Sequence, residues 1–463
     1  MWCIRKKSTM QKTLRKAFII GLSILIALLL NYLLPYEDKV NKGLALLVFI
    51  AILWLTEIVH ITVTALLIPI LAILLGLEQT KPALQAFANP TIFLFFGGFV
   101  IATALSVQKL DRYIANRVIS LARGNFVVAI LLLFSVTSLL SMGISNTATA
   151  AMIIPLAIGM LKNVDYQTNR NTYVFVILGV AYSASVGGMG SLVGSPPNAI
   201  VASQLHLTFS DWLKYGIPVM MGLMPLMLLA MYIVLKPNFK IKVTTENLVD
   251  KLTRKQYITI IIFIVTALSW IFGDFLNSTI SSILGIAKIA EFDAIVAMIA
   301  AVLVCFSGVA SWKEVQDNTD WGVLLLFGGG LTLSAVLTSS GASKALVDGV
   351  VFLVEGKHFY LIGLLVAVFI IFLTEFTSNT ASAALLVPIF ISIAQELEMN
   401  LLGLSLIIGL GASCAFMLPV ATPPNAIAYG TGMVNQNDMI KIGFVLNILS
   451  VIFISTMAYW FWF

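Results

Sequence analysis

Charged side chains are scarce in this sequence. Lys, Arg, Asp and Glu make up 10% of its 463 residues, whereas 60% of the residues are hydrophobic. A typical soluble domain carries about 25% charged residues. Apolar runs of about 20 residues, the length that crosses the hydrocarbon core of a bilayer as a helix, recur along almost the whole chain. The composition therefore excludes a soluble globular protein and predicts an all-α polytopic membrane protein.

Cysteine and histidine are also rare, with three of each. Cys3, Cys305 and Cys414 lack the spacing of metal ligands, so we expect free thiols and no disulfide framework. The sequence contains no G-x-x-x-x-G-K-[ST] loop for an ATP-driven pump, and neither G-x-S-x-G nor H-E-x-x-H for a hydrolase. We expect that the protein is not an enzyme and that it takes its energy from gradients.

The amino terminus is basic and is followed by an apolar run that begins at Phe18. This run is too long for the core of a signal peptide, and no small-residue cleavage site follows it. We therefore expect residues 1–17 to be cytoplasmic and residues 18–36 to form a retained first transmembrane helix.

Two motifs occur twice at nearly the same separation along the chain. SNTATAAMIIP at 145–155 returns as SNTASAALLVP at 378–388, and GSPPNAI at 194–200 returns as ATPPNAI at 421–427. An FGG string also repeats, at 96–98 and 327–329. Motifs that keep one separation indicate two structural repeats of about equal length.

The apolar runs predict about eleven transmembrane helices and two re-entrant helical hairpins. The hairpins, 126–161 and 360–395, each contain two apolar stretches around an SNT triplet. The runs 172–206 and 401–430 each contain a Pro-Pro pair, which breaks a helix. The crossings are placed near 18–36, 44–59, 61–77, 91–106, 172–206, 212–236, 256–275, 291–309, 320–340, 401–430 and 440–463, with an amphipathic surface stretch at 107–123.

This layout predicts two inverted repeats, one over 37–236 and the other over 256–463, joined by a cytoplasmic linker at 237–255. Five crossings separate the two SNT triplets, and an odd number turns the second copy upside down. In the same layout 20 Lys and Arg residues lie on the side of the amino terminus and seven on the other. Because cytoplasmic loops are enriched in Lys and Arg, we expect a cytoplasmic amino terminus and an extracytoplasmic carboxyl terminus in the cell membrane.

The four helix-breaking loops predict a binding site. Interrupted helices occur at membrane depth only where they are buried in protein or line a water-filled cavity, and secondary transporters use them in this way. Carbonyls and the side chains of Ser145, Asn146, Ser378 and Asn379 can ligate Na⁺, whereas helix amino termini favour an anion. The alternative is that SNT only caps a helix and PPN only kinks one. The occurrence of both motifs twice favours the site.

Three ionisable residues need separate interpretations. Glu375 lies within an apolar hairpin, three residues before Ser378. We expect it to hold the hairpin tip through hydrogen bonds, and direct binding of a cation or proton is the alternative. Glu57 and His60 have an E-x-x-H spacing without partner carboxylates. For these two residues we expect a role in a short loop or at a helix end.

At the paired SNT and PPN strings, the WLTE string at 54–57 and the paired FGG strings, the sequence resembles the divalent anion/sodium symporter (DASS) family. This family carries Krebs-cycle dicarboxylates, citrate and, in some members, sulfate. The resemblance covers nearly the whole chain and implies a scaffold part, a moving transport part, an elevator-type mechanism and a homodimer in the lipid bilayer. In two departures from the family, Ser195 replaces a frequent Thr and His60 replaces an expected Pro.

The resemblance also implies site residues. The first Na⁺ would bind the carbonyls of Ser141, Ser145 and Gly194 and the side chain of Asn146, and the second would bind the carbonyls of Thr374, Thr377 and Ala421 and the side chain of Asn379. The substrate would be bound by two SNT triplets and two proline turns: Ser145, Asn146, Thr147, Ser195, Pro196, Ser378, Asn379, Thr380, Thr422 and Pro423.

The expected function is Na⁺-coupled secondary active transport of C4-dicarboxylate-type anions, such as succinate, malate, fumarate and 2-oxoglutarate. Exchange of one dicarboxylate for another at the same site is the first alternative. An anion channel is the alternative of another class.

Overall fold

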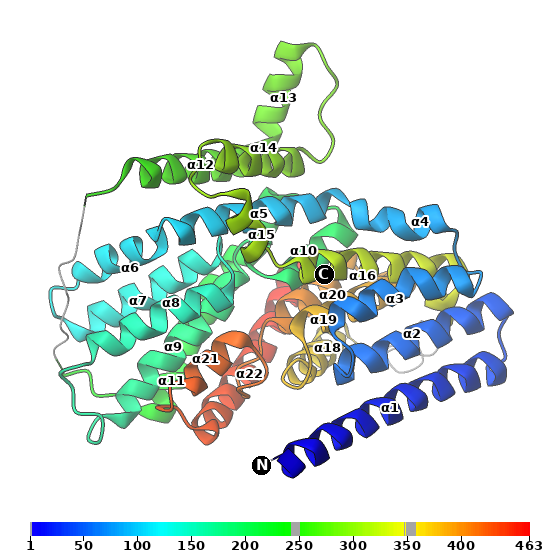
Figure 1. The fold of residues 1–463 in the computed structure, drawn as a ribbon, viewed down its shortest axis with the longest axis horizontal. Helices are drawn as coiled ribbons and strands as arrows, with labels where there is room; N and C mark the ends of the chain where they lie inside the picture. Colours follow the sequence, from blue (N-terminus) through cyan, green and yellow to red (C-terminus); the bar gives the residue numbers. More distant parts are fainter. Residues whose placement is uncertain (1, 242–250, 347, 349–357) are drawn as a thin grey trace.

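The computed structural model describes residues 2–241, 251–346, 348 and 358–463, with side chains from residue 14 onward. Within these residues the chain forms helices and connecting loops, without a β-strand (Figure 1). The predicted linker at 237–255 lies partly outside the described residues.

Eight helices of the described chain are long and apolar enough to cross a membrane. They are α1 (Trp2–Leu33, apolar from Leu14), α2 (Asp38–Thr56), α5 (Pro90–Val107) with α4 (Thr80–Gln85) and η1 (Ala86–Ala88) before it, α9 (Arg170–Gly188), α11 (Phe209–Leu235), α12 (Arg254–Ile271), α16 (Trp321–Ser340), and α22 (Gln436–Met457) with η3 (Ala458–Trp462). Shorter helices occupy the other three predicted crossings: α3 (Ile61–Leu74), α14 (Phe292–Phe306), and α20 (Leu401–Ala412) with α21 (Pro423–Gly430). The chain is therefore an all-helical, multi-pass membrane protein, as predicted.

The SNT segments form two helical hairpins. In the first, α7 (Phe126–Ser141) packs against α8 (Asn146–Met160), and the two lie side by side in Figure 1. In the second, a short turn joins α18 (Phe359–Leu373) to α19 (Asn379–Glu396). At 15 to 18 residues, these helices are at or below the usual length of a membrane-spanning helix. Each SNT triplet lies where one helix ends and the next begins.

The Pro-Pro motifs begin new helices after a break. After α9 ends at Gly188, η2 (Leu192–Gly194) leads to α10 (Pro196–Leu205), and in the second half α20 ends at Ala412 before α21. Pro196 and Pro423 occupy the first helical positions, where a missing N–H costs no hydrogen bond. The chain is therefore interrupted within both ranges, 172–206 and 401–430.

The two halves interlock through their FGG helices. The α5 helix of the first half packs against α14 of the second half, and α16 of the second half packs against α3 of the first. A Cβ on Gly97 would lie 2.5 Å from the Ala297 Cβ, and one on Gly329 would lie 2.7 Å from the Ala65 Cβ. Glycine at these positions lets the helix backbones approach closely.

The duplication extends to the last helix of each half. Both α11 and α22 begin with a capping box, formed by Thr208 and Asp211 in one and by Asn435 and Asp438 in the other. Both helices then place a glycine against the loop that interrupts the preceding helix. A Cβ on Gly216 would lie 2.4 Å from the Met189 carbonyl oxygen, and one on Gly443 would lie 2.4 Å from that of Phe416.

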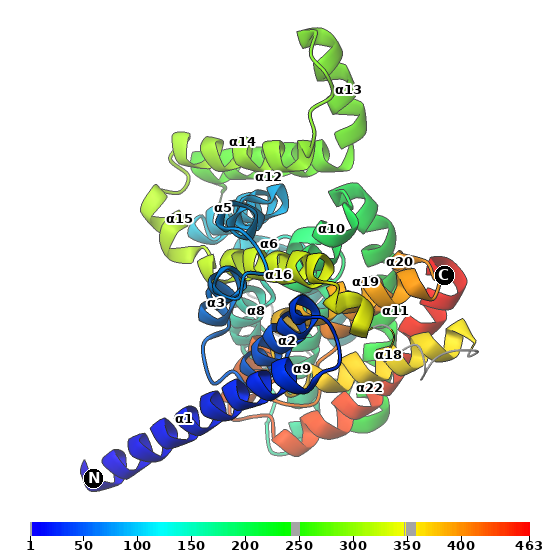
Figure 2. The ribbon, with the colours of Figure 1, turned by 90° about the vertical axis from the view of Figure 1, so that its right-hand side faces the viewer.

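Four further helices lie beside the paired elements of the two halves. α1 runs along the edge of the molecule, and α13 (Gly273–Leu284) projects from its body in both views (Figures 1 and 2). The sequence did not predict α13 or the short α15 (Trp312–Asn318), because both lie between stronger apolar runs. α6 (Leu110–Ser120) occupies the predicted amphipathic stretch at 107–123.

Candidate functional site

The four helix interruptions meet at one cavity of about 640 Å³. Its lining combines the first turns of α8, α10, α19 and α21 with parts of α5 and the segment before α16. All ten residues that the resemblance assigns to the substrate line it: Ser145, Asn146, Thr147, Ser195, Pro196, Ser378, Asn379, Thr380, Thr422 and Pro423. The fold thus brings together, at one cavity, motifs that lie in opposite halves of the chain.

Helix amino termini supply the positive potential of this cavity. Helix α8 begins at Asn146, α10 at Pro196, α19 at Asn379 and α21 at Pro423. The free N–H groups and the dipole at such ends favour negative charge. The described residues that line the cavity include no Lys or Arg. An anion bound there would therefore be held by helix termini and by neutral hydroxyl and amide groups.

An oxygen-rich cluster surrounds Asn146. Ser141 Oγ lies 2.5 Å from the Asn146 Oδ1 atom and 2.7 Å from the Ala184 carbonyl oxygen. With the amide turned over, its nitrogen donates to the carbonyls of Ala184 and Gly194 at 3.0 and 3.3 Å. A Cβ on Gly194 would lie 2.5 Å from the Gly188 carbonyl oxygen and 3.0 Å from that of Ser141, so the position is open only to glycine. With Oδ1 facing inward, the cluster presents oxygens alone, which is the donor set that Na⁺ takes in interrupted transporter helices.

The second half repeats this cluster around Asn379. Thr374 Oγ1 lies 2.5 Å from Asn379 Oδ1 and 2.9 Å from the Ala412 carbonyl oxygen. Ala421 lines the cavity together with Asn379. Thr377 is engaged elsewhere through its hydroxyl, which bonds to the Leu373 carbonyl at 3.0 Å and to Ser382 Oγ at 2.8 Å. The oxygens of this cluster are neutral, and the described chain groups no three His, Cys, Asp or Glu side chains at a possible metal site.

The SNT serines do cap helices, as the simpler interpretation held. Ser145 Oγ accepts from the Ala148 N–H at 3.2 Å, and Ser378 Oγ accepts from the Ala381 N–H at 3.4 Å. Capping accounts for the serines but not for the asparagines, whose side chains face the oxygen clusters. The two interpretations of SNT therefore apply to different residues of the same triplet.

The asparagine of each PPN motif holds the interrupted segment in shape. Asn198 Nδ2 donates to the carbonyls of Gly188 and Ser191 at 2.8 and 2.7 Å. Asn425 Nδ2 makes the equivalent pair of bonds to Ala415 and Leu418, both at 3.0 Å. Both asparagines are fully buried. PPN therefore does more than kink a helix, and the repetition of the whole motif in both halves was a sequence signal for this role.

Two carboxylates, those of Glu57 and Asp320, also line the cavity. The sequence motifs did not predict either residue at this site. Glu57 ends α2 with a left-handed backbone (φ 47°), and Asp320 caps α16 by accepting from the Val323 N–H at 3.2 Å. His60 caps α3 by accepting from the Thr62 N–H at 3.3 Å. The expected helix-end role of Glu57 and His60 is confirmed.

Glu375 joins the tip of the second hairpin to the interrupted segment 413–422. Its buried carboxylate accepts hydrogen bonds from the backbone N–H groups of Phe416, Met417 and Leu418 at 2.7, 2.9 and 3.1 Å, and from Asn447 Nδ2 at 2.7 Å. Glu375 is absent from the lining of the central cavity. These contacts are those expected of a residue that holds the hairpin tip.

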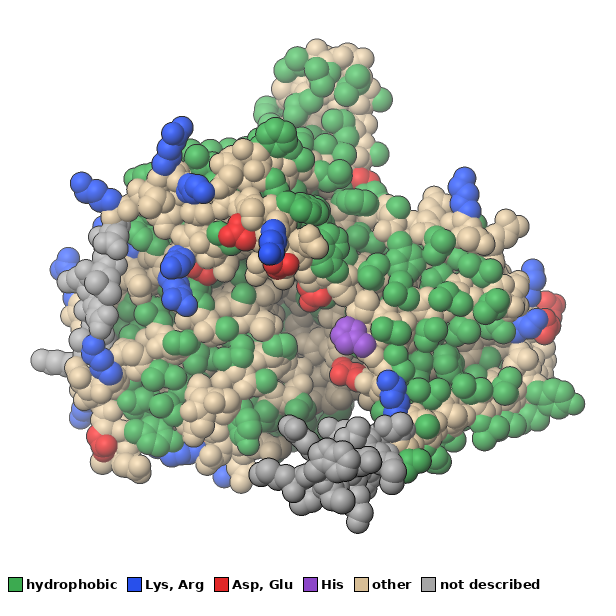
Figure 3. Space-filling model, viewed as in Figure 1, with side chains coloured by type: hydrophobic (Ala, Val, Ile, Leu, Met, Phe, Trp, Pro, Cys, Tyr) green, Lys and Arg blue, Asp and Glu red, His purple; other side chains and the backbone are tan. Residues whose placement is uncertain are grey.

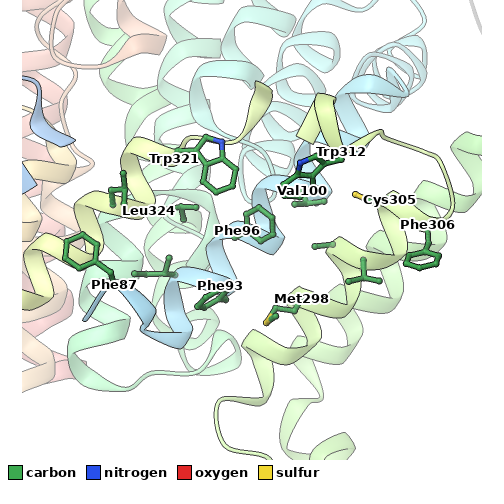
Figure 4. A pocket seen from close by; sticks show the side chains of 14 residues that line it. Phe87, Phe93, Phe96, Val100, Met298, Cys305, Phe306, Trp312, Trp321 and Leu324 are labelled. Atoms are coloured by element: carbon green, nitrogen blue, oxygen red, sulfur yellow. The ribbon is translucent and has the colours of Figure 1, made fainter. Parts of the chain in front are cut away.

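A second large cavity, of about 610 Å³, has a different chemistry (Figure 4). It lies between α5, α14, α15 and α16, and aromatic and aliphatic side chains such as Phe96, Met298 and Trp321 line it. The Trp321 indole N–H is already bonded to the Gln316 carbonyl at 3.0 Å. The described residues that line this cavity carry no charged side chain.

Known proteins match this chain over nearly its full length. The model of a family described as the sodium:sulfate symporter transmembrane region matches residues 13–463. The chain is 62% identical to a Haemophilus influenzae protein described as an uncharacterized transporter, over 97% of each chain. It is 32% identical to the sodium-dependent dicarboxylate transporter SdcS of Staphylococcus saprophyticus, over 91% of this chain and 86% of that protein.

A solved structure shares the fold. The YdaH transporter of Alcanivorax borkumensis superposes with a TM-score of 0.59 over 97% of this chain and 99% of that one, at 14% sequence identity. At this identity the likeness concerns the fold alone.

Proposed function

The chain belongs to the sodium:sulfate symporter family, and on that premise we propose that it transports C4-dicarboxylate-type anions together with Na⁺. Succinate, malate, fumarate and 2-oxoglutarate are the proposed substrates. Relatives at 32 to 33% identity that are described as sodium-dependent dicarboxylate transporters support this assignment. The observation that carries the proposal is the meeting of four helix amino termini at one polar cavity whose described lining contains no Lys or Arg.

The duplicated site suits a substrate with two like ends. One carboxylate would be bound by Ser145, Asn146 and Thr147 with the Ser195–Pro196 turn, and the other by Ser378, Asn379 and Thr380 with the Thr422–Pro423 turn. Two oxygen clusters, around Asn146 and Asn379, would hold Na⁺ beside the two carboxylates. The bound cations would then offset the substrate charge that no basic side chain of the lining offsets.

We further propose an elevator-type cycle in a homodimer within the cell membrane. The hairpins and interrupted helices would form the moving part, because they carry the SNT and PPN motifs that line the cavity in both repeats. The excess of Lys and Arg on one side supports a cytoplasmic amino terminus and an extracytoplasmic carboxyl terminus.

Uptake into proteoliposomes tests the proposal. Labelled succinate should accumulate only with an inward Na⁺ gradient, and unlabelled malate, fumarate and 2-oxoglutarate should compete. Accumulation that requires internal dicarboxylate and does not depend on the Na⁺ gradient would instead show that the protein is an exchanger. Large conductance without counterflow would assign an anion channel. Competition by sulfate or citrate in the same assay would define the breadth of the site.

A further inference from the structure

The connecting helix α6 presents a basic surface beside the first hairpin. Its buried face, with Leu110, Ala115 and Ile119, packs toward α7 and α8. The rest of the helix and its two ends carry four basic side chains, Lys109, Arg112, Arg117 and Arg123. Figure 3 shows Lys and Arg gathered at the end of the molecule where Figure 1 places α6. The helices beside this surface, α7 and α8, are apolar.

No acidic side chain neutralises this surface by direct contact. In the part of the chain that the structure describes, none of the four basic side chains forms a salt bridge. Asp111, the acidic residue of α6, lies on its buried side, and its carboxylate accepts from the Arg112 backbone N–H at 2.7 Å. The charge of Arg112 acts on Asp111 only at longer range. The guanidinium of Arg112 therefore remains available to an external anion.

A groove between α6 and α8 gives this charge a defined shape. It has a volume of about 220 Å³ and is lined by Arg112 and Asn116 on one side and by α8 on the other, through Met152, Ile153, Pro155 and Leu156. One water occupies about 30 Å³ in the liquid, so the groove can hold a larger group. The Asn116 amide has no hydrogen-bond partner in the described chain. The groove thus combines a cationic and amide-bearing wall with an apolar wall.

We propose that this groove binds an anionic phospholipid. Its phosphate would bind between Arg112 and Asn116, and an acyl chain would lie along Met152 and Leu156. The adjoining helix α7 exposes Val127, Val128 and Leu131, by 40, 40 and 47%, as expected of a face that contacts lipid. Basic pockets between membrane helices bind anionic headgroups in this way. The bound lipid bridges α6 and the first hairpin, and it does so whatever the transported substrate is.

Lipid retention by the purified full-length protein tests the site. Protein equilibrated with equal amounts of phosphatidylglycerol and phosphatidylcholine should retain the anionic lipid preferentially, as measured by native mass spectrometry. Arg112→Gln should lower that preference about tenfold, which is the expected effect of losing one direct hydrogen bond to a charged group. Arg117→Gln and Arg123→Gln remove the same charge from positions outside the groove lining. These controls should change the preference less than twofold.

Two further arms separate binding in the groove from a general attraction between charged surfaces and from binding of free phosphate. Met152→Trp fills the apolar wall without changing charge, and it should reduce retention while the protein stays monodisperse. Millimolar inorganic phosphate should not displace the lipid. No preference in the wild-type protein, equal losses in Arg112→Gln and the two controls, or displacement by inorganic phosphate would each overturn the proposal.

Discussion

The two halves of the molecule secure their interrupted helices with different chemistry. In the second half, the Glu375 carboxylate accepts four hydrogen bonds, three of them from consecutive backbone N–H groups and one from Asn447. When the SNT triplets are aligned, Glu375 corresponds to Met142, and when the PPN motifs are aligned, Asn447 corresponds to Met220. Both methionines lie against Gly190: a Cβ there would lie 2.8 Å from Met220 Sδ and 3.2 Å from Met142 Cγ.

In the first half, the Ser191 hydroxyl takes the place of the Glu375 carboxylate. Ser191 Oγ donates to the Met142 carbonyl oxygen, and thereby ties the interrupted segment to the hairpin tip. The position equivalent to Ser191 in the second half is Leu418, which has no hydroxyl. The asparagines at the cavity and in the PPN motifs, by contrast, are the same in both halves. The two halves therefore share these asparagines, but different contacts hold their interrupted segments in place.

The cavity asparagines should give the largest and most symmetric effects. Asn146→Ala and Asn379→Ala each remove an amide from an oxygen cluster and from the cavity lining. We expect each variant to lose Na⁺-driven uptake by at least about 100-fold, a loss equivalent to ~2.7 kcal/mol. Size-exclusion profiles and thermal unfolding should stay close to wild type, because the hydroxyls of Ser141 and Thr374 still link the hairpins to the Ala184 and Ala412 carbonyls in these variants. Uptake near the wild-type level in either variant would contradict the site assignment.

Replacing Glu375 should destabilise the protein more than replacing Met142, the equivalent residue of the first half. Glu375→Gln replaces one acceptor oxygen by an NH₂ group that faces backbone N–H donors. Unsatisfied buried donors and loss of charge-assisted bonds should cost about 3 kcal/mol of stability. Met142→Leu, at the equivalent position, conserves volume and should cost less than about 1.5 kcal/mol. Thermal unfolding in detergent measures both variants.

Transport by the Glu375→Gln variant distinguishes a structural role of Glu375 from direct binding of a cation or proton. If Glu375 holds the hairpin tip, the number of Na⁺ ions per substrate and the pH dependence of residual uptake should equal those of the wild type. A changed Na⁺ stoichiometry or a shifted pH profile, with stability retained, would instead assign Glu375 to direct binding of a cation or proton.

The repeated strings explain why the central site could be predicted from sequence. SNT and PPN mark the start of all four helices at the cavity, because serine and proline suit the cap and the first turn of a helix that begins after a break. The hairpins and breaks could therefore be located within a few residues. Glu375 was recognisable as a carboxylate inside an apolar hairpin, but its donors on the 416–418 segment and Asn447 follow only from the fold.

Features that depend on packing between distant segments escaped prediction. Glu57 and Asp320 line the cavity because α2 and α16 end and begin beside it, and no local pattern links either residue to the SNT motifs. Likewise, α13 has no long apolar run, so the apolar pattern predicts no separate helix between the crossings at 256–275 and 291–309. The interlocking of α5 with α14 and of α16 with α3 depends on contacts across the two halves.

The PPN asparagines should give equal, moderate effects in the two halves. Asn198→Ala and Asn425→Ala each remove two hydrogen bonds to carbonyls of the interrupted segment and leave those buried carbonyls without this donor. We expect each to lower stability by about 2 kcal/mol. Chemical denaturation followed by tryptophan fluorescence gives the values. A difference greater than about 1 kcal/mol between the two variants, the size of a typical single hydrogen bond, would show that their roles are not equivalent.

The smallest effects should come from the residues that precede the two proline pairs. Thr422 caps α21 by accepting from the Asn425 N–H at 3.2 Å, whereas Ser195 makes no such cap and lies 3.3 Å from Ser413 Oγ. Thr422→Ala should therefore cost about 1 kcal/mol. Ser195→Ala and Ser413→Ala should be non-additive by about 0.5 kcal/mol in a double-mutant cycle, because each removes the same bond. Full additivity of the serine pair would show that this hydroxyl contact contributes nothing, and Ser195 and Thr422 would then differ only in the cap.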